Sequence, residues 1–70
     1  MNNIKTSLTR CENDVLQLIT QGLSAKQIGV KLFVCSRTVE FHTGHILTKL
    51  GVSNRTEATI WAIRNGLVSA

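Results

Sequence analysis

The stretch from Ser36 to Leu50, SRTVEFHTGHILTKL, has the length and the apolar spacing of an amphipathic helix. At about 100° per residue, one side of this helix carries a stripe suited to a core, formed by Val39, His42, Ile46 and Leu50. The other side combines few long charges with an aromatic ring, a glycine and hydrogen-bonding groups: Arg37, Glu40, Phe41, Gly44, His45 and Thr48. The sequence therefore predicts a helix with one buried face and one face suited to contact a partner.

Capping signals divide the chain into four expected helices, at residues 10–21, 25–33, 37–50 and 55–65. Three pairs have the spacing of a capping box: Thr9 with Glu12, Ser24 with Gln27, and Asn54 with Glu57. Ser36 is the expected cap of the third helix, and glycines suited to helix ends stand at Gly22, Gly51 and Gly66. Since strand signals are weak and proline is absent, we expect an all-α, compact four-helix domain.

The second and third expected helices form a helix-turn-helix, because only a short turn separates them. Gly29 lies inside the second helix, where glycine costs about 1 kcal/mol relative to alanine. This cost is most easily understood if the third helix passes too close for a side chain. We expect Phe33, Val34 and Cys35 to form a buried turn between the two helices. A helix-turn-helix with a partner face makes DNA the leading candidate partner.

The chain has 70 residues and a net charge of +4, which suits one small domain that attracts a polyanion. No apolar run approaches the ~20 residues that cross a bilayer, and the polar opening has no hydrophobic region of a secretory signal. We therefore expect a cytoplasmic protein with no membrane partner. Residues 1–7 are expected to be a flexible N-terminal segment and residues 8–70 the domain.

Cysteine and histidine are interpreted as structural residues rather than as a metal site or a catalytic pair. Cys11 and Cys35 stand at apolar positions and are expected in the core, with a redox role open only for accessible or neighbouring thiols. His42 is expected to be buried and bonded to a backbone carbonyl, whereas His45 points outward. Because the paired-ligand spacing of a zinc finger is absent and so small a chain offers little concavity, we expect no metal, cofactor or catalysis.

With the helices placed, the sequence resembles the effector domain of LuxR/FixJ/NarL-type transcription regulators, which also includes stand-alone GerE-like proteins. The first matching pieces are Leu8-Thr9-Arg10, Glu12, Val15-Leu16, Gly22-Leu23-Ser24, Lys26 and Ile28. The later pieces are Ser36, Thr38-Val39, His42, Ile46, Lys49-Leu50-Gly51-Val52 and Arg55-Thr56-Glu57-Ala58. So many pieces in one order are more specific than a bare helix-turn-helix pattern. The resemblance implies that the third helix enters the major groove of DNA and that the fourth supports pairing of two copies.

Under this resemblance the base-reading side chains come from Glu40, Phe41 and Gly44, with Arg37, His45 and Thr48 as neighbours. Two of these depart from a pattern that is often basic: Glu40 can accept from a cytosine amino group, and Phe41 can pack on a thymine methyl. Phosphate contacts are expected from cations and from helix N-termini. They are assigned to Ser24, Lys26, Ser36, Arg37, Thr38, Lys49 and Arg55.

The fourth helix is apolar around more of its circumference than one core contact needs. Ala58 and Ala62 suit close packing on the first helix, which leaves Ile60, Trp61 and Arg64 as candidates for a two-fold interface. That Trp61 only covers the small core is an equally good interpretation.

The sequence thus predicts sequence-specific binding of double-stranded DNA, as a homodimer on half-sites about one helical turn apart. The domain is either a stand-alone regulator or the output half of a larger one. The competing hypothesis is a protein-interaction module of the same fold that binds RNA polymerase or another regulator without reading DNA. Acidic Glu40 and side-chain-free Gly44 are the features that support it.

Overall fold

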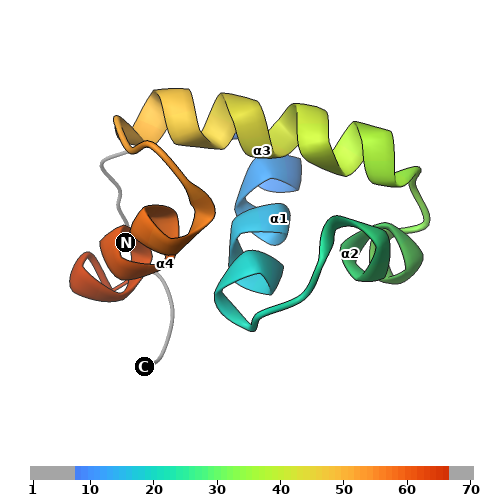
Figure 1. The fold of residues 1–70 in the computed structure, drawn as a ribbon, viewed down its shortest axis with the longest axis horizontal. Helices are drawn as coiled ribbons and strands as arrows, with labels where there is room; N and C mark the ends of the chain where they lie inside the picture. Colours follow the sequence, from blue (N-terminus) through green and yellow to red (C-terminus); the bar gives the residue numbers. More distant parts are fainter. Residues whose placement is uncertain (1–7, 67–70) are drawn as a thin grey trace.

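The computed structural model describes residues 8–66, and the expected segment 1–7 therefore lies outside the described residues. Four helices and no strand occur in this range, as expected (Figure 1): α1 Arg10–Thr20, α2 Ala25–Leu32, α3 Ser36–Leu50 and α4 Arg55–Arg64. The all-α fold is confirmed, and each helix differs from its expected bounds by one residue at one end. None of these helices combines the length and the apolar composition needed to cross a bilayer.

The helices are arranged around α3, which extends along one side of the molecule (Figure 1). Helix α1 packs beneath α3, while α2 and α4 lie toward its opposite ends and both also contact α1. Helices α2 and α4 do not contact each other. The long third helix is consequently supported along its length, and its far side faces away from the rest of the domain.

Local capping explains where the first two helices begin. The Thr9 hydroxyl accepts from the Glu12 amide at 3.1 Å, and Oε1 of Glu12 accepts from the Thr9 amide at 3.0 Å. Ser24 and Gln27 make the same reciprocal pair, at 3.2 and 2.9 Å. Both boxes satisfy amides that have no partner inside their helix, and both are confirmed as the sequence predicted.

The caps of the last two helices depart from expectation. Asn54 caps α4 by accepting from the Glu57 amide at 2.9 Å, but the Glu57 carboxylate accepts from Ser53 N at 2.8 Å instead of from Asn54. The expected cap of α3 is wrong by one residue. Cys35 holds that position without a side-chain hydrogen bond, and Ser36 is already helical. A thiol is a weak acceptor, so the N-terminus of α3 lacks the side-chain bond that the other helices have.

We expect Cys35→Ser to raise the free energy of unfolding by about 1 kcal/mol, because serine supplies the missing hydrogen bond. In a domain of this size that change raises Tm by roughly 4–8 °C, measurable by circular dichroism. Cys35→Ala is the matched control, since it removes the thiol without adding an acceptor. Equal melting temperatures for the serine and alanine variants would contradict this account of the cap.

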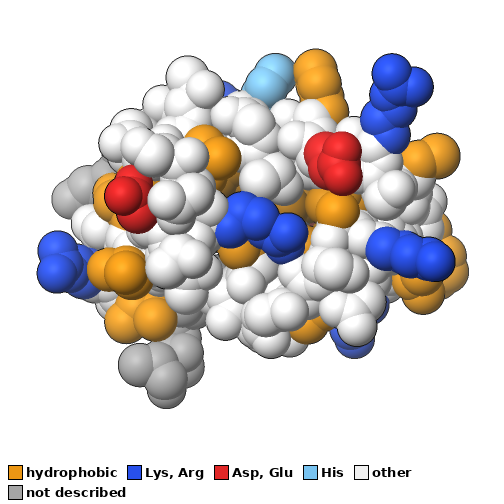
Figure 2. Space-filling view, in the orientation of Figure 1, with side chains coloured by type: hydrophobic (Ala, Val, Ile, Leu, Met, Phe, Trp, Pro, Cys, Tyr) orange, Lys and Arg blue, Asp and Glu red, His pale blue; other side chains and the backbone are white. Residues whose placement is uncertain are grey.

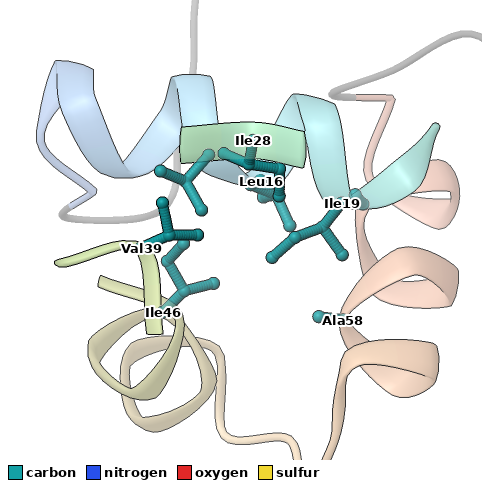
Figure 3. Packing of buried hydrophobic residues seen from close by; sticks show 8 residues of the cluster. Leu16, Ile19, Ile28, Val39, Ile46 and Ala58 are labelled. Carbon is teal, nitrogen blue, oxygen red and sulfur yellow. The ribbon is translucent and has the colours of Figure 1, made fainter. Parts of the chain in front are cut away.

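The core is a single cluster of aliphatic side chains from all four helices (Figure 3): Val15, Leu16, Ile19, Ile28, Val39, Ile46, Ala58 and Ala62. In the close-up, Leu16, Ile28 and Val39 converge with Ile46, while Ala58 faces the cluster from α4. The small residues of α4 bring that helix close to α1, as the sequence suggested. Burial of these side chains is the main favourable contribution to folding.

Gly29 is buried where α2 meets the turn that leads into α3. A Cβ atom built on Gly29 would lie 2.6 Å from the carbonyl oxygen of Val34 and 3.4 Å from Ser36 N. The close approach to Gly29 that the sequence predicted is therefore present, but the approaching backbone belongs to the turn and not to the middle of α3. The Val34 amide donates to the Gly29 carbonyl at 2.9 Å, which ties the turn to α2.

The expectation of a buried turn is wrong. Phe33 ends α2 in the left-handed conformation, with φ of 60°, and its side chain is 95% exposed. Val34 and Cys35 are exposed as well. Because backbone contacts with Gly29 hold the turn, its side chains are directed outward instead of inward.

Cys11 is likewise exposed, so neither cysteine belongs to the core. At the start of α1 the buried position is taken by Glu12, whose carboxylate has hydrogen-bond partners there. Cys11 lies at the edge of α1, with its sulfur 3.5 Å from Nε2 of His42.

Candidate nucleic-acid interface

The outward face of α3 is exposed along the positions that the sequence assigned to base reading: Arg37, Glu40, Phe41, Gly44, His45 and Thr48. Phe41 is 62% exposed, although it is the most apolar member of the set. Apart from the nearby backbone of α3 itself, nothing lies within 4 Å of a Cβ built on Gly44, which leaves this position open to an approaching partner. This face is suited to contact a surface that offers both apolar and hydrogen-bonding groups.

Aromatic contacts orient the centre of this face. The ring of Phe41 lies 4.4 Å from that of His45, tilted by 46°, and 6.0 Å from that of His42 in an edge-on arrangement. The Thr48 hydroxyl donates to the Gly44 carbonyl at 3.1 Å, so its oxygen remains only an acceptor toward a partner. Phe41 thus stands beside two imidazole rings rather than alone in solvent.

Beneath this face lies Glu12, an acidic residue that is only 3% exposed. Its Oε1 atom accepts from Lys49 Nζ at 2.6 Å and from the Thr9 amide, and its Oε2 atom lies 3.6 Å from His45 Nδ1. The hydrogen bond from Lys49 lowers the pKa of Glu12, the Thr9 amide lowers it further, and burial opposes both effects. Glu12 therefore joins the first turn of α1 to two successive turns of α3.

This cluster changes how Lys49 and His45 are interpreted, since the sequence assigned Lys49 to phosphate and His45 to bases. Lys49 donates to a buried carboxylate while its side chain stays 30% exposed, and His45 contacts both that carboxylate and the Phe41 ring. The capping-box role of Glu12 was visible in the sequence, but a carboxylate can accept further hydrogen bonds at both of its oxygens. Only the packing of α1 on α3 shows which side chains reach it.

The other expected phosphate-contact residues divide into exposed and internal groups. Lys26 is exposed in the first turn of α2, and Arg37 is exposed in the first turn of α3. Ser24 and Ser36 are exposed at the starts of the same helices, and Thr38 is half-buried. In contrast, Nη2 of Arg55 donates to the Leu23 carbonyl at 2.6 Å, which fixes the start of α4 to the loop before α2.

The outer surface of α4 carries the residues expected at a dimer interface. Ile60 and Arg64 are exposed, whereas Trp61 is half-buried and packs against the core. These three residues line a shallow hollow together with Val52 and Glu57. Trp61 therefore covers the core and also contributes to an outward surface, so both interpretations of this residue have a structural basis.

His42 corrects another expectation. Its Nε2 atom faces Cys11, and its Nδ1 atom is buried without a hydrogen-bond partner, so the expected bond to a backbone carbonyl is not formed.

Within residues 8–66, no three His, Cys, Asp or Glu side chains are grouped as a metal ion would require. The outward face of α3 remains the main candidate site.

A short helix, a turn held against a glycine and a longer helix with an exposed face define this chain as a helix-turn-helix domain. The chain belongs to the luxR family of bacterial regulatory proteins, because residues 6–62 match the GerE family model. This family consists of transcription regulators rather than enzymes. The resemblance stated from the sequence is thereby confirmed.

Two curated relatives show the same relationship. The chain is 48% identical over 63 residues to the transcriptional regulatory protein LiaR of Bacillus subtilis, covering 90% of this chain and 30% of LiaR. It is 46% identical over 61 residues to the transcriptional regulatory protein DegU of Brevibacillus brevis, covering 87% of this chain and 26% of DegU. The chain thus spans less than a third of the length of these relatives.

Solved structures agree with the sequence relationship. The transcription factor GerE superposes with a TM-score of 0.82 at 34% identity, covering 93% of this chain and 97% of the GerE chain. The response regulator ChrA of a heme-sensing two-component system superposes with a TM-score of 0.83 at 41% identity, covering 94% of this chain and 33% of ChrA. The same fold thus occurs as nearly a whole chain in one structure and as a third of a chain in the other.

Proposed function

We propose that this chain binds double-stranded DNA sequence-specifically, with α3 in the major groove, and regulates transcription in the bacterial cytoplasm. The observation that carries the proposal is the outward face of α3, where Phe41 is 62% exposed beside hydrogen-bonding side chains and an open glycine backbone. An α-helix fits the major groove, where base edges offer donors, acceptors and thymine methyl groups. Membership in a family of transcription regulators supports the same function.

Base selection is assigned to three positions along this face. Glu40 accepts a hydrogen bond from a cytosine amino group, and Phe41 packs on a thymine methyl. Gly44, which carries no side chain, lets the helix backbone approach the groove floor. His45 supports the Phe41 ring from the Glu12 side, while Arg37 and Thr48 flank the contact.

Phosphate contacts are assigned to the exposed residues near the starts of α2 and α3: Ser24, Lys26, Ser36, Arg37 and Thr38. The two helix N-termini add partial positive charge there. Lys49 and Arg55 are instead assigned to internal contacts, because each has an oxygen of this chain within 2.6 Å. Such phosphate contacts position the domain without selecting the sequence.

A dimer formed through Ile60, Trp61 and Arg64 of α4 is proposed for the DNA-bound state. Since α4 lies toward one end of α3, pairing there leaves the outward face of α3 open in both copies (Figure 1). Two-fold pairing would match half-sites about one helical turn apart.

The proposal is tested by selecting duplexes from a random pool and titrating labelled duplexes with the full chain by fluorescence anisotropy. We expect a common motif, two copies per duplex by analytical ultracentrifugation, and altered base preference in Glu40→Ala and Phe41→Ala. Ile63→Gln, an exposed change on α4 outside the assigned residues, is the control and should keep the parent's preference. Weak binding without an enriched motif would favour the alternative, a protein-interaction module that binds polymerase or another regulator.

Salt dependence separates phosphate contacts from internal ones. We expect Lys26→Ala and Arg37→Ala each to lower DNA affinity about tenfold, or ~1.4 kcal/mol, on all duplex sequences. Each should also reduce the logarithmic salt slope by about 0.9, since one phosphate is no longer neutralised. Lys49→Ala should leave the slope unchanged because Lys49 binds Glu12. A slope altered by Lys49→Ala but not by Lys26→Ala or Arg37→Ala would reverse the assignment.

A further inference from the structure

A second surface lies at the C-terminal end of α2, next to Lys26 and Ser36, which are assigned to phosphate contacts above. Val30, Phe33 and Val34 are 71%, 95% and 38% exposed, and all three line one hollow. The same hollow includes Gly29, Lys26, Cys35 and Ser36. We call the three apolar side chains and this hollow the α2 patch. Contiguous apolar side chains of this kind on a small domain mark a contact surface.

Phe33 is the least expected member of the α2 patch. It adopts the left-handed conformation, with φ of 60° and ψ of 42°, which glycine or asparagine adopts at lower cost. Its ring is also almost wholly in water, so it gains little from burial. Neither the helix end nor the core therefore explains a phenylalanine at this position. A contact with another molecule would explain it.

Charge around the α2 patch indicates the kind of partner. Lys26 lines the hollow, and Arg37 is exposed in the first turn of α3, directly after Ser36. None of the acidic residues in the described part of the chain lines this hollow. In Figure 2, orange and blue side chains gather at the end of the molecule where Figure 1 places α2. The α2 patch is therefore apolar, and the charged side chain that lines its hollow, Lys26, is a cation.

We propose that the α2 patch binds an acidic segment of another protein that carries an apolar anchor side chain. The anchor covers Phe33 and Val30, and a flanking carboxylate faces Lys26. Duplex DNA would meet the cations but offers little apolar surface to cover a phenylalanine and two valines. A second copy of this chain is a poor match, since its most buried acid is Glu12 and its other described acids, Asp14, Glu40 and Glu57, are dispersed.

Because the α2 patch shares Lys26 and Ser36 with the proposed phosphate contacts, the acidic segment and DNA compete for that edge of the hollow. The α2 patch lies toward the end of α3 opposite α4, so pairing through α4 leaves it open (Figure 1). The proposal does not depend on base reading by α3, because the patch is defined by its own exposure and charge.

The test uses the full chain and a library of twelve-residue synthetic peptides in three matched sets. One set places Leu, Ile or Phe among Asp and Glu, the second places the same anchors among Lys and Arg, and the third keeps the acids but replaces the anchors with Ser. Affinities are measured by fluorescence anisotropy, and the contact is mapped from amide shifts in NMR spectra. We expect the first set to bind best and to shift α2 and the following turn.

Phe33→Asn is the decisive variant, because asparagine tolerates the left-handed conformation and should keep the melting temperature at or above that of the parent. We expect it to weaken the best acidic peptides about tenfold, while Ile63→Gln on α4 leaves them unchanged. Equal binding of the three sets, or no effect of Phe33→Asn, would overturn the proposal. A tenfold loss of duplex affinity in Phe33→Asn would assign the patch to DNA. Loss of a concentration-dependent dimer in that variant would assign it to self-association.

Discussion

Gly29→Ala is expected to lower the free energy of unfolding by about 2 kcal/mol, although alanine is the better helix former. The added Cβ would lie 2.6 Å from the Val34 carbonyl oxygen, so backbone rather than a flexible side chain must move. Overpacking of this kind costs roughly 1–3 kcal/mol, and a backbone neighbour places the cost near the upper end. The gain of about 1 kcal/mol in helix propensity only partly offsets it.

Gly44→Ala is the matched control for this prediction. Gly44 also lies inside a helix, but a Cβ built there meets nothing within 4 Å. The same substitution should therefore raise the free energy of unfolding by about 1 kcal/mol. Urea unfolding followed by circular dichroism measures both changes. Destabilisation by Gly44→Ala, or none by Gly29→Ala, would show that the turn does not press on α2.

Glu12→Gln is expected to lower the free energy of unfolding by about 2–3 kcal/mol. Glutamine has nearly the same shape and can still accept from the Thr9 amide, but it removes the charge that Lys49 faces at 2.6 Å. Removal of one partner from a buried ion pair costs about 3–5 kcal/mol. The value here is lower because the Lys49 side chain is 30% exposed and regains water. Asp14→Asn changes the net charge equally from an exposed site on α1 and should cost at most about 0.5 kcal/mol.

The same residue makes stability depend on pH. The folded pKa of Glu12 lies below its ordinary value of 4.5, so the unfolded chain binds this proton more readily. The stabilisation that the ionised Glu12 side chain provides is therefore complete above about pH 5 and is lost as the pH falls below 4.5 through the folded pKa. Urea unfolding between pH 3 and pH 7 should show a steeper acid loss in the parent than in Glu12→Gln. Parallel curves for the two proteins would exclude Glu12 as the source.

The helices were predictable to within one residue because their signals are local. A capping box such as Thr9 with Glu12 operates over three residues of chain, and a left-handed glycine such as Gly22 acts at one position. Neither depends on how the helices pack. The helix-turn-helix followed from two such segments, separated by a short turn, and from Gly29 inside the first of them.

The sequence failed to predict burial and side-chain partners where these depend on contacts between segments distant in the chain. Cys11 stands at an apolar position of α1, yet Glu12 is the residue buried at that end of the helix. Its burial is possible because Lys49, distant in sequence, donates to its carboxylate. The bond from Arg55 to the Leu23 carbonyl, 32 residues away in sequence, was likewise not predicted. Sequence spacing identified which side chains leave the core, but not which of them meet another part of the chain.

The Glu12 cluster also bears on how new specificities could evolve in this scaffold. Glu12 contacts His45 and Lys49, which lie one helical turn apart on α3. These two contacts fix the rotation of α3 about its own axis. Arg37, Glu40 and Phe41 make no hydrogen bond or ion pair with Glu12. Under the proposed function, exchange of Arg37 or Glu40 is therefore expected to alter what the helix recognises while Glu12 keeps its contacts with His45 and Lys49. We would then expect the preferred site to change without a compensating mutation in α1.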